Sequence, residues 1–191
     1  MKKRILALCL ALFAVMSLAA CSGNGDGTPD GFQKASLDKA CSYELYVPES
    51  WVVSSGSETD YTMTSIAATD PCSLSVAVVD TLVDQTYDTY WQEKQEEYKK
   101  LFDTFTPDEA SAQGAVVNGS NWDGRRYLFN ATYGEMEYRC MQIFIPHSSS
   151  LVEGYRLYVV TYMAQKDHFD THYDNEQDQD IATILSYFKF R

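Results

Sequence analysis

Two histidines near the carboxyl-terminal end could share a metal ion, because His168 and His172 are four residues apart and would lie on one face of a helix. Zinc takes nitrogen and oxygen ligands, and Asp167 or Glu176 could complete such a site. The spacing lacks the glutamate of a His-Glu-x-x-His protease site, and the surrounding segment is acidic and polar. A solvent-facing helix is therefore the preferred interpretation, and a metal site at these two histidines is the alternative.

Other residue patterns give little support for catalysis or cation binding. The alternating acids that begin at Asp174 suggest a calcium loop, but its sixth and twelfth positions are Gln179 and Leu185 instead of glycine and glutamate. The three serines at 148–150 directly follow His147, which is typical of a polar turn, and no Gly-x-Ser-x-Gly elbow occurs. We expect no enzyme activity, no bound metal and no cofactor.

The charge of the chain argues against nucleic acid as a partner. The formal net charge is −12 at pH 7, and a strongly acidic chain repels nucleic acid. The arginine doublet Arg125-Arg126 falls in a predicted strand, where neighbouring side chains point to opposite faces of the sheet. We therefore interpret the doublet as structural ion-pair donors and not as a basic binding patch.

Three cysteines remain for the folded part of the chain once Cys9 and Cys21 are set aside with the amino-terminal segment. An exported domain can keep a disulfide, and Cys41 and Cys72 flank the first two predicted strands, so they are the preferred pair. At least one of the three then stays unpaired. The alternative is that Cys41, Cys72 and Cys140 are all small buried thiols. No C-x-x-C spacing supports a redox centre.

Aromatic residues are abundant, with 14 Tyr, 9 Phe and 3 Trp. Tyrosine and tryptophan offer large contact areas and are enriched at interfaces, so an exposed group of them would indicate a binding surface. Most of these residues fit the inner faces of the predicted sheet and helices. Tyr46, Tyr90 and Trp122 fall on predicted loops or polar faces, and we expect them to be exposed and to contact a ligand or a partner.

The hydrophobic pattern predicts an α+β fold. Alternation of apolar and polar residues predicts strands at 43–47, 62–68, 74–79, 115–117, 125–132, 136–145 and 155–163. Spacings of three and four residues predict helices over 84–105, with Pro107 just beyond, and over 169–188. Because 155–163 is apolar on both faces, it is expected at the sheet centre. The result is an antiparallel β-sheet flanked by helices.

The first 21 residues have the layout of a secretory signal, with Lys2, Lys3 and Arg4 before an apolar run that ends Leu18-Ala19-Ala20-Cys21. This layout resembles the lipobox of bacterial lipoproteins, which implies a signal peptide over 1–20 and a diacylated Cys21. The run is shorter than the roughly 20 residues of a membrane span. The Gly-rich and polar residues 21–39 predict a flexible tether, and 40–191 is expected to form a single domain.

Two segments of the predicted domain resemble PsbP-like domains, which include the photosystem II extrinsic protein and many small bacterial lipoproteins. The first is Tyr43-Glu44-Leu45-Tyr46-Val47-Pro48-Glu49-Ser50-Trp51, an extended strand followed by proline and tryptophan. The second runs from Tyr158-Val159-Val160-Thr161-Tyr162 to a closing helix with Ile184-Leu185-Ser186-Tyr187-Phe188. The resemblance implies an α/β/α sandwich and a binding or assembly factor without catalytic residues.

Together these features predict an exported protein, anchored by the lipid on Cys21 to the outer face of a bacterial membrane. We expect a non-catalytic protein that binds another envelope protein. A small-ligand or cell-wall glycan binder with a Tyr/Trp-lined cleft is the alternative, and a metal-dependent enzyme that uses His168 and His172 is a remote one. The oligomeric state stays open.

Overall fold

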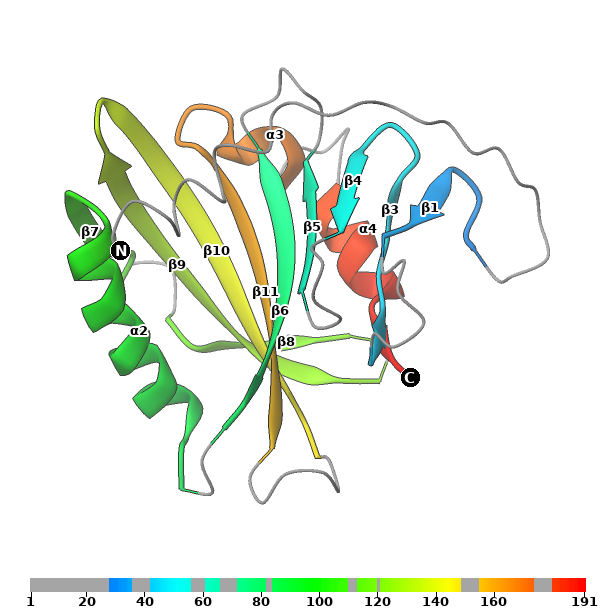
Figure 1. Ribbon diagram of the computed structural model, residues 1–191, viewed down its shortest axis with the longest axis horizontal. Helices are drawn as coiled ribbons and strands as arrows, with labels where there is room; N and C mark the ends of the chain where they lie inside the picture. Colours follow the sequence, from blue (N-terminus) through cyan, green and yellow to red (C-terminus); the bar gives the residue numbers. More distant parts are fainter. Residues whose placement is uncertain are drawn as a thin grey trace.

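The chain folds around one large β-sheet, shown with its covering helices in the computed structural model (Figure 1). The structure describes residues 28–35, 42–55, 61–65, 72–81, 84–109, 113–119, 121–148, 155–173 and 180–191. Among these residues, no helix is both long and apolar enough to cross a bilayer.

The sheet contains eight strands within the described residues, and all paired neighbours are antiparallel. In spatial order they are β4 (Val52–Ser55), β5 (Tyr61–Ser65), β6 (Ser73–Asp80), β11 (Arg156–Gln165), β10 (Met136–His147), β9 (Asp123–Tyr133) and β7 (Thr104–Pro107), while β8 (Ala115–Asn118) also pairs with β9. The central place of β11 agrees with its two apolar faces. The predicted α+β class with an antiparallel sheet is confirmed.

One face of the sheet is covered by α2 (Tyr87–Leu101), on the left of Figure 1. The helix begins after Thr86, whose hydroxyl accepts a hydrogen bond from the Thr89 backbone and so satisfies one free N–H of the first turn. Its buried residues Tyr90 and Trp91 pack on side chains that point from β9 and β10 toward this face. This contact buries one half of the core.

The opposite face is covered by α3 (Phe169–Tyr173), at the top of Figure 1, and by α4 (Asp180–Tyr187) and two small strand pairs on its right. The pairs are β1 (Phe32–Lys34) with β3 (Tyr46–Pro48) and β2 (Tyr43–Glu44) with β12 (Lys189–Phe190). Helices on both faces make the α/β/α layering that was expected. The helix predicted over 169–188 is present as α3 and α4, and 174–179 lie outside the described residues.

The helix predicted over 84–105 is wrong at its end, because α2 stops at Leu101 and Phe102 is already extended. Asp103 then donates its backbone N–H to Thr132 at 2.9 Å, and β7 pairs with β9 from Thr104 onward. The aromatic spacing continues past the helix because Phe105 still faces the same core as Trp91. Strand pairing therefore overrides a helical pattern that the sequence carries through to Phe105.

The tether predicted over 21–39 is wrong for its second part, because residues 32–34 form β1. The amide of Gln33 donates to the carbonyl oxygens of Pro48 and Glu49, at 3.2 and 3.1 Å, and fixes β1 to the turn after β3. Ala35 is fully buried and donates to Leu45 at 2.8 Å. The folded part thus includes residues before 40, the predicted start of the domain.

Candidate functional site

A groove of about 520 Å³ lies on the α4 face of the sheet, between β8, β9 and β10 on one side and α3 and α4 on the other. We call it the α4 groove. Its apolar side chains come from both sides, and the described residues that line it are Val117, Asn118, Trp122, Arg126, Leu128, Met141, Ile143, Tyr173, Ile181, Ala182, Leu185 and Ser186. The volume falls within the roughly 300–1,000 Å³ that is typical of small-molecule sites. An apolar ligand could therefore be bound there.

Arg126 brings a positive charge to this apolar lining. Along β9, Arg126 shares its face with Leu128, which belongs to the α4-side core, whereas Arg125 shares its face with Tyr127 in the core under α2. Arg126 donates from Nη1 to the hydroxyl of Tyr173 at 3.0 Å, and Arg125 donates to the carbonyl of Gly114 at 3.2 Å. The prediction that the two arginines point to opposite faces is thus confirmed.

Arg126 has no carboxylate partner among the described residues, and the α4 groove is lined by none. The arginines of neighbouring strands differ: Arg139 pairs with Asp108 at 3.1 Å and Arg156 with Asp80 at 3.0 Å. The Nε atom of Arg126 is buried without a hydrogen-bond acceptor. A partly buried guanidinium with only a neutral acceptor is costly, so the groove has an uncompensated positive charge.

Trp122 lines the α4 groove and is held in place on two sides. Its indole N–H donates to the carbonyl of Phe188 at 3.1 Å, which ties the β8–β9 turn to the end of α4. On its other side, a Cβ atom at Gly119 would overlap the indole ring, so only glycine fits at that position. The position of the Trp122 ring is therefore fixed by packing and by this hydrogen bond.

The expectation that Tyr46, Tyr90 and Trp122 are exposed is wrong, because their exposed fractions are 2, 5 and 6%. Tyr46 lies between the ammonium groups of Lys34 and Lys189, 5.8 and 5.9 Å from its ring centre. Tyr90 packs edge-on against Phe144 at 5.2 Å. Of the three, Trp122 lines the α4 groove, whereas Tyr46 and Tyr90 are core residues.

The two histidines of the possible metal site have different surroundings. His168 precedes α3, is half exposed and lies 3.9 Å from Asp167. His172 is buried in α3 with its ring edge-on to Trp51, 6.0 Å between centres. Glu176 lies outside the described residues, and in the part of the chain that the structure describes no three metal-binding side chains gather.

The cysteines do not provide a nucleophile in the described part of the chain. Cys140 is buried in the core under α2, and this burial raises the pKa of its thiol, so the reactive thiolate is not formed near neutral pH. Cys72 is buried as well, with its sulfur 3.8 Å from the carbonyl oxygen of His168. Cys21 and Cys41 lie outside the described residues, so the lipid site and the Cys41–Cys72 disulfide stay predictions.

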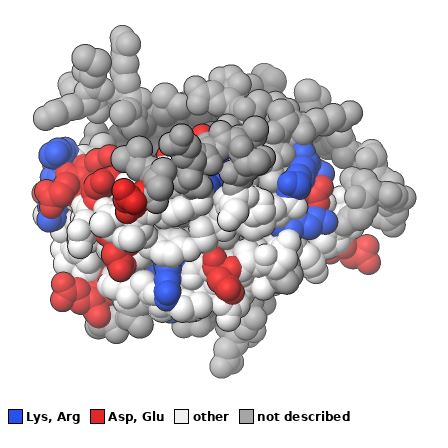
Figure 2. Space-filling view, turned by 90° about the horizontal axis from the view of Figure 1, so that it is seen from below, with Lys and Arg blue, Asp and Glu red and all other residues white. Residues whose placement is uncertain are grey.

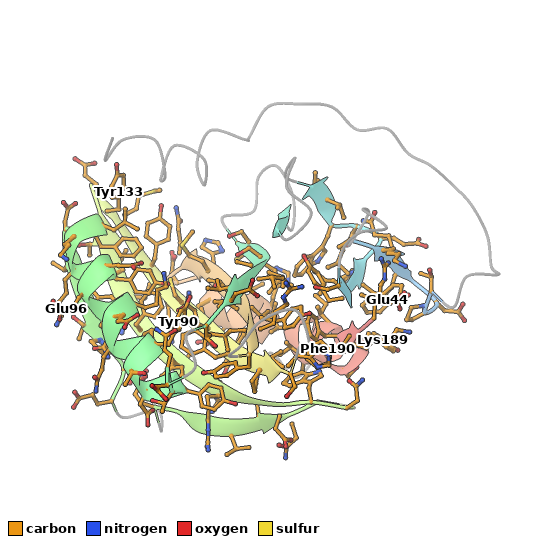
Figure 3. The ribbon with its side chains drawn as sticks, turned by 60° about the horizontal axis from the view of Figure 1, so that its bottom comes forward. Glu44, Tyr90, Glu96, Tyr133, Lys189 and Phe190 are labelled. Carbon is orange, nitrogen blue, oxygen red and sulfur yellow. The ribbon has the colours of Figure 1, made fainter. Side chains whose placement is uncertain are left out.

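A cluster of ion pairs fastens the small strands at the end of the molecule opposite α2. Glu44 pairs with Lys189 at 2.8 Å, Lys34 at 3.1 Å and Arg191 at 3.5 Å, and accepts a hydrogen bond from the hydroxyl of Tyr46 at 3.1 Å. Figure 3 shows Glu44 and Lys189 close together, and Figure 2 shows basic side chains at that end. The hydrogen bond from Lys189, more than those from Lys34 and Tyr46, lowers the pKa of Glu44 to about 2. The cluster is structural, since its cations already share an anion.

Replacing Glu44 by glutamine is expected to lower the free energy of unfolding at pH 7 by about 1–2 kcal/mol, after allowance for screening by solvent. The folded state holds the Glu44 pKa near 2 against an ordinary value of 4.5. The stabilisation is therefore complete above about pH 4.5 and is lost as the pH falls toward 2. Urea unfolding of both proteins between pH 7 and pH 2.5 measures the difference.

Glu96→Gln is the matched control, since Glu96 pairs with Lys99 at 2.7 Å on the exposed side of α2. Exposed pairs contribute little, so this variant should unfold almost like the parent protein. A Glu44→Gln effect that stays constant down to pH 2.5 would contradict the assigned role of the carboxylate.

A second hollow, of about 560 Å³, lies where β10 begins and β11 ends. It is lined by Glu135, Met136, Glu137, Gln165, Lys166 and Asp167. Lys166 and Glu137 pair with each other at 3.0 Å, and both are more than half exposed. This hollow thus presents mainly solvated charges that are already paired, so the α4 groove is the better candidate site.

Sequence reasoning found part of the α4 groove and missed the rest. Trp122 was named as a contact residue, but Arg126 was interpreted as an ion-pair donor. The alternation along β9 places Arg126 and Leu128 on one face, and this signal is readable in the sequence. The walls supplied by α3 and α4 depend on how these helices pack across the sheet, which no local pattern specifies.

Comparisons with known proteins support the fold alone. No family model matches the chain, and no curated protein matches it in sequence. A protein from Bacteroides thetaiotaomicron is 8% identical over 81% of this chain and 47% of its own, with a TM-score of 0.50. This chain therefore spans about half the length of that protein. A point mutant of Mog1 is 10% identical over 83% of this chain and 95% of its own, also with a TM-score of 0.50.

LpqN of Mycobacterium tuberculosis, described as involved in cell envelope biogenesis, is 14% identical over 83% of this chain and 77% of its own. Its TM-score of 0.43 is too low to carry an argument. The other two matches show that the arrangement of sheet and helices occurs in solved proteins. None of the three assigns a ligand or an activity to this chain.

Proposed function

We propose that this chain is a lipid-anchored, extracytoplasmic binding protein without catalytic activity, and that the α4 groove is its binding site. The signal-like start and the small residues before Cys21 support export and lipid attachment. The apolar groove that contains an uncompensated cation carries the proposal of binding. Such a site can hold a ligand, but it offers no nucleophile and general base in contact with each other.

We further infer that the domain is PsbP-like. The segment 43–51, which carries the first part of the resemblance, supplies β2, β3 and the turn before β4. The second part supplies β11, α4 and the residues that lead to β12. The layered α/β/α arrangement is what the resemblance implies, and it supports a non-catalytic binding role.

A small ligand is favoured over a protein partner. The protein-partner expectation rests on the export signal, the PsbP-like resemblance and the absence of a catalytic pattern in the sequence, and the three aromatic residues expected to contact a ligand or a partner are buried. The large hydrophobic residues that are exposed in the described part are scattered singly: Val52, Val116, Tyr133 and Tyr187. Scattered apolar residues are ordinary on a protein surface and do not indicate an interface. The groove, which Trp122 and Tyr173 help to line, fits the alternative of an aromatic-lined cleft.

Native mass spectrometry of the mature chain tests this function. The sample is residues 21–191 with Cys21→Ser, so that no attached lipid obscures the result, incubated with a lipid extract of bacterial envelopes. We expect a bound small molecule in this protein. Ala182→Phe, which places a ring in the groove from exposed Ala182, should abolish the complex.

The matched control is Val116→Phe, because Val116 is 58% exposed on β8 and does not line the groove. This variant should keep the bound molecule. The proposal is wrong if Ala182→Phe binds the same molecule as strongly, or if no small molecule is bound by any of the three proteins.

A further inference from the structure

We propose that the ligand of the α4 groove is a single-chain amphiphile with an anionic head, a carboxylate or a phosphate, which pairs with Arg126 and Tyr173. Its hydrocarbon chain would lie against Val117 and Leu185, over the buried side chains of Leu128, Met141 and Ile143. This inference rests on the proposed binding function of the groove and adds the chemical class of the ligand.

The charge of the groove is the first argument. Arg126 brings a guanidinium group, and among the described residues that line the α4 groove there is no acid and no second base. The whole chain has 27 acidic and 15 basic residues, so a lone cation in an apolar cleft is unusual for this protein. An anion bound beside Arg126 would supply the negative charge that no described side chain of the groove provides.

The geometry of the two polar side chains is the second argument. Tyr173 accepts a hydrogen bond from Arg126 at 3.0 Å, and within the described residues its own O–H has no acceptor. The Tyr173 ring is fixed by Phe169, 4.8 Å between centres, and lies parallel to Tyr162 at 6.4 Å. The guanidinium of Arg126 and the hydroxyl of Tyr173 are therefore two hydrogen-bond donors fixed next to each other in the groove. An oxyanion can accept hydrogen bonds from both.

The apolar surface is the third argument. The partly exposed apolar side chains of the groove are Val117 of β8 and Leu185 of α4. Beneath them Leu128, Met141 and Ile143 are only 4, 1 and 0% exposed, and their backbones pair within the sheet. These side chains offer no hydrogen bonds to the backbone of a peptide. A hydrocarbon chain needs none and gains from leaving water. One charged head and one apolar chain thus match the two parts of the groove.

Calorimetric titration of the mature chain, residues 21–191 with Cys21→Ser, tests the inference. The probes are dodecanoate and dodecyl phosphate, below their micelle-forming concentrations, and dodecanol, below its solubility limit. The three probes have the same hydrocarbon chain and differ only in the head group. The effect of the head-group charge on affinity is therefore measured without any protein variant. We expect at least one anionic probe to bind about tenfold to a hundredfold more tightly than dodecanol, as charge-assisted hydrogen bonds require. The stronger of the two anions identifies a carboxylate or a phosphate head.

Protein variants locate the effect. Arg126→Gln should remove the preference for the anion, Arg126→Lys should restore part of it, and Arg125→Gln, on the opposite face of β9, should leave it unchanged. Equal binding of all three probes, or an equal loss in Arg125→Gln, would overturn the anionic head while leaving an apolar groove. If none of the three probes binds, the inference is also overturned. If the proposed binding function itself is wrong, no small molecule is bound in the native mass spectrometry experiment with the envelope extract.

Discussion

Trp91→Ala is expected to lower the free energy of unfolding by about 3–5 kcal/mol, the cost of removing a large aromatic ring from a packed core. Trp91 stacks on Tyr127 at 4.7 Å between ring centres, and it also contacts Phe129 at 5.9 Å and Phe144 at 6.1 Å. These residues come from β9 and β10, so the ring joins α2 to the sheet. Urea unfolding followed by far-UV circular dichroism measures the loss.

Val116→Ala is the control for this prediction, because Val116 is 58% exposed and removing its methyl groups opens no cavity. Its effect should stay within about 0.5 kcal/mol. If Trp91→Ala costs less than about 1 kcal/mol, α2 does not depend on this ring and the packing described for that face is wrong.

Cys21→Ser is expected to move the protein almost completely from the membrane fraction to the soluble fraction. The two acyl chains proposed for the cysteine would supply about 0.8 kcal/mol for each buried methylene, and a strongly acidic chain is repelled by anionic lipid. Cell fractionation and partition into Triton X-114 measure the change.

Cys9→Ser is the matched control, since Cys9 lies within the apolar run of the proposed signal and leaves with it. This variant should remain in the membrane fraction and in the detergent phase. A Cys21→Ser protein that still partitions into detergent would show that the anchor is not a lipid on this residue.

The central part of the fold could be predicted because its patterns are long. The segments that became β9, β10 and β11 are 11, 12 and 10 residues long, and the turn between β9 and β10 places Gly134 at a φ of 63°, where glycine is favoured. β11 is buried along most of its length, as its apolar faces indicate.

Short elements and surface exposure could not be predicted, because they depend on contacts that are distant in the chain. β1 has three residues and exists by pairing with β3. The sequence predicts that Tyr46 is exposed, yet Lys34 and Lys189 cover its ring from two other strands. Likewise, the alternation along β9 predicts on which face of the sheet Arg126 lies. It does not predict that Tyr173 of α3 accepts a hydrogen bond from Arg126.

The α4 groove as a binding site is the central claim, and methyl NMR of the mature chain with Cys21→Ser tests it most directly. Spectra of protein labelled at isoleucine and methionine methyl groups are recorded while dodecanoate is added. The account predicts that Met141, Ile143 and Ile181 shift, because they line the groove. Met136 and Met163, which pack against the core under α2, should stay unchanged. Shifts confined to Met136 and Met163, or no shift at all, would contradict it.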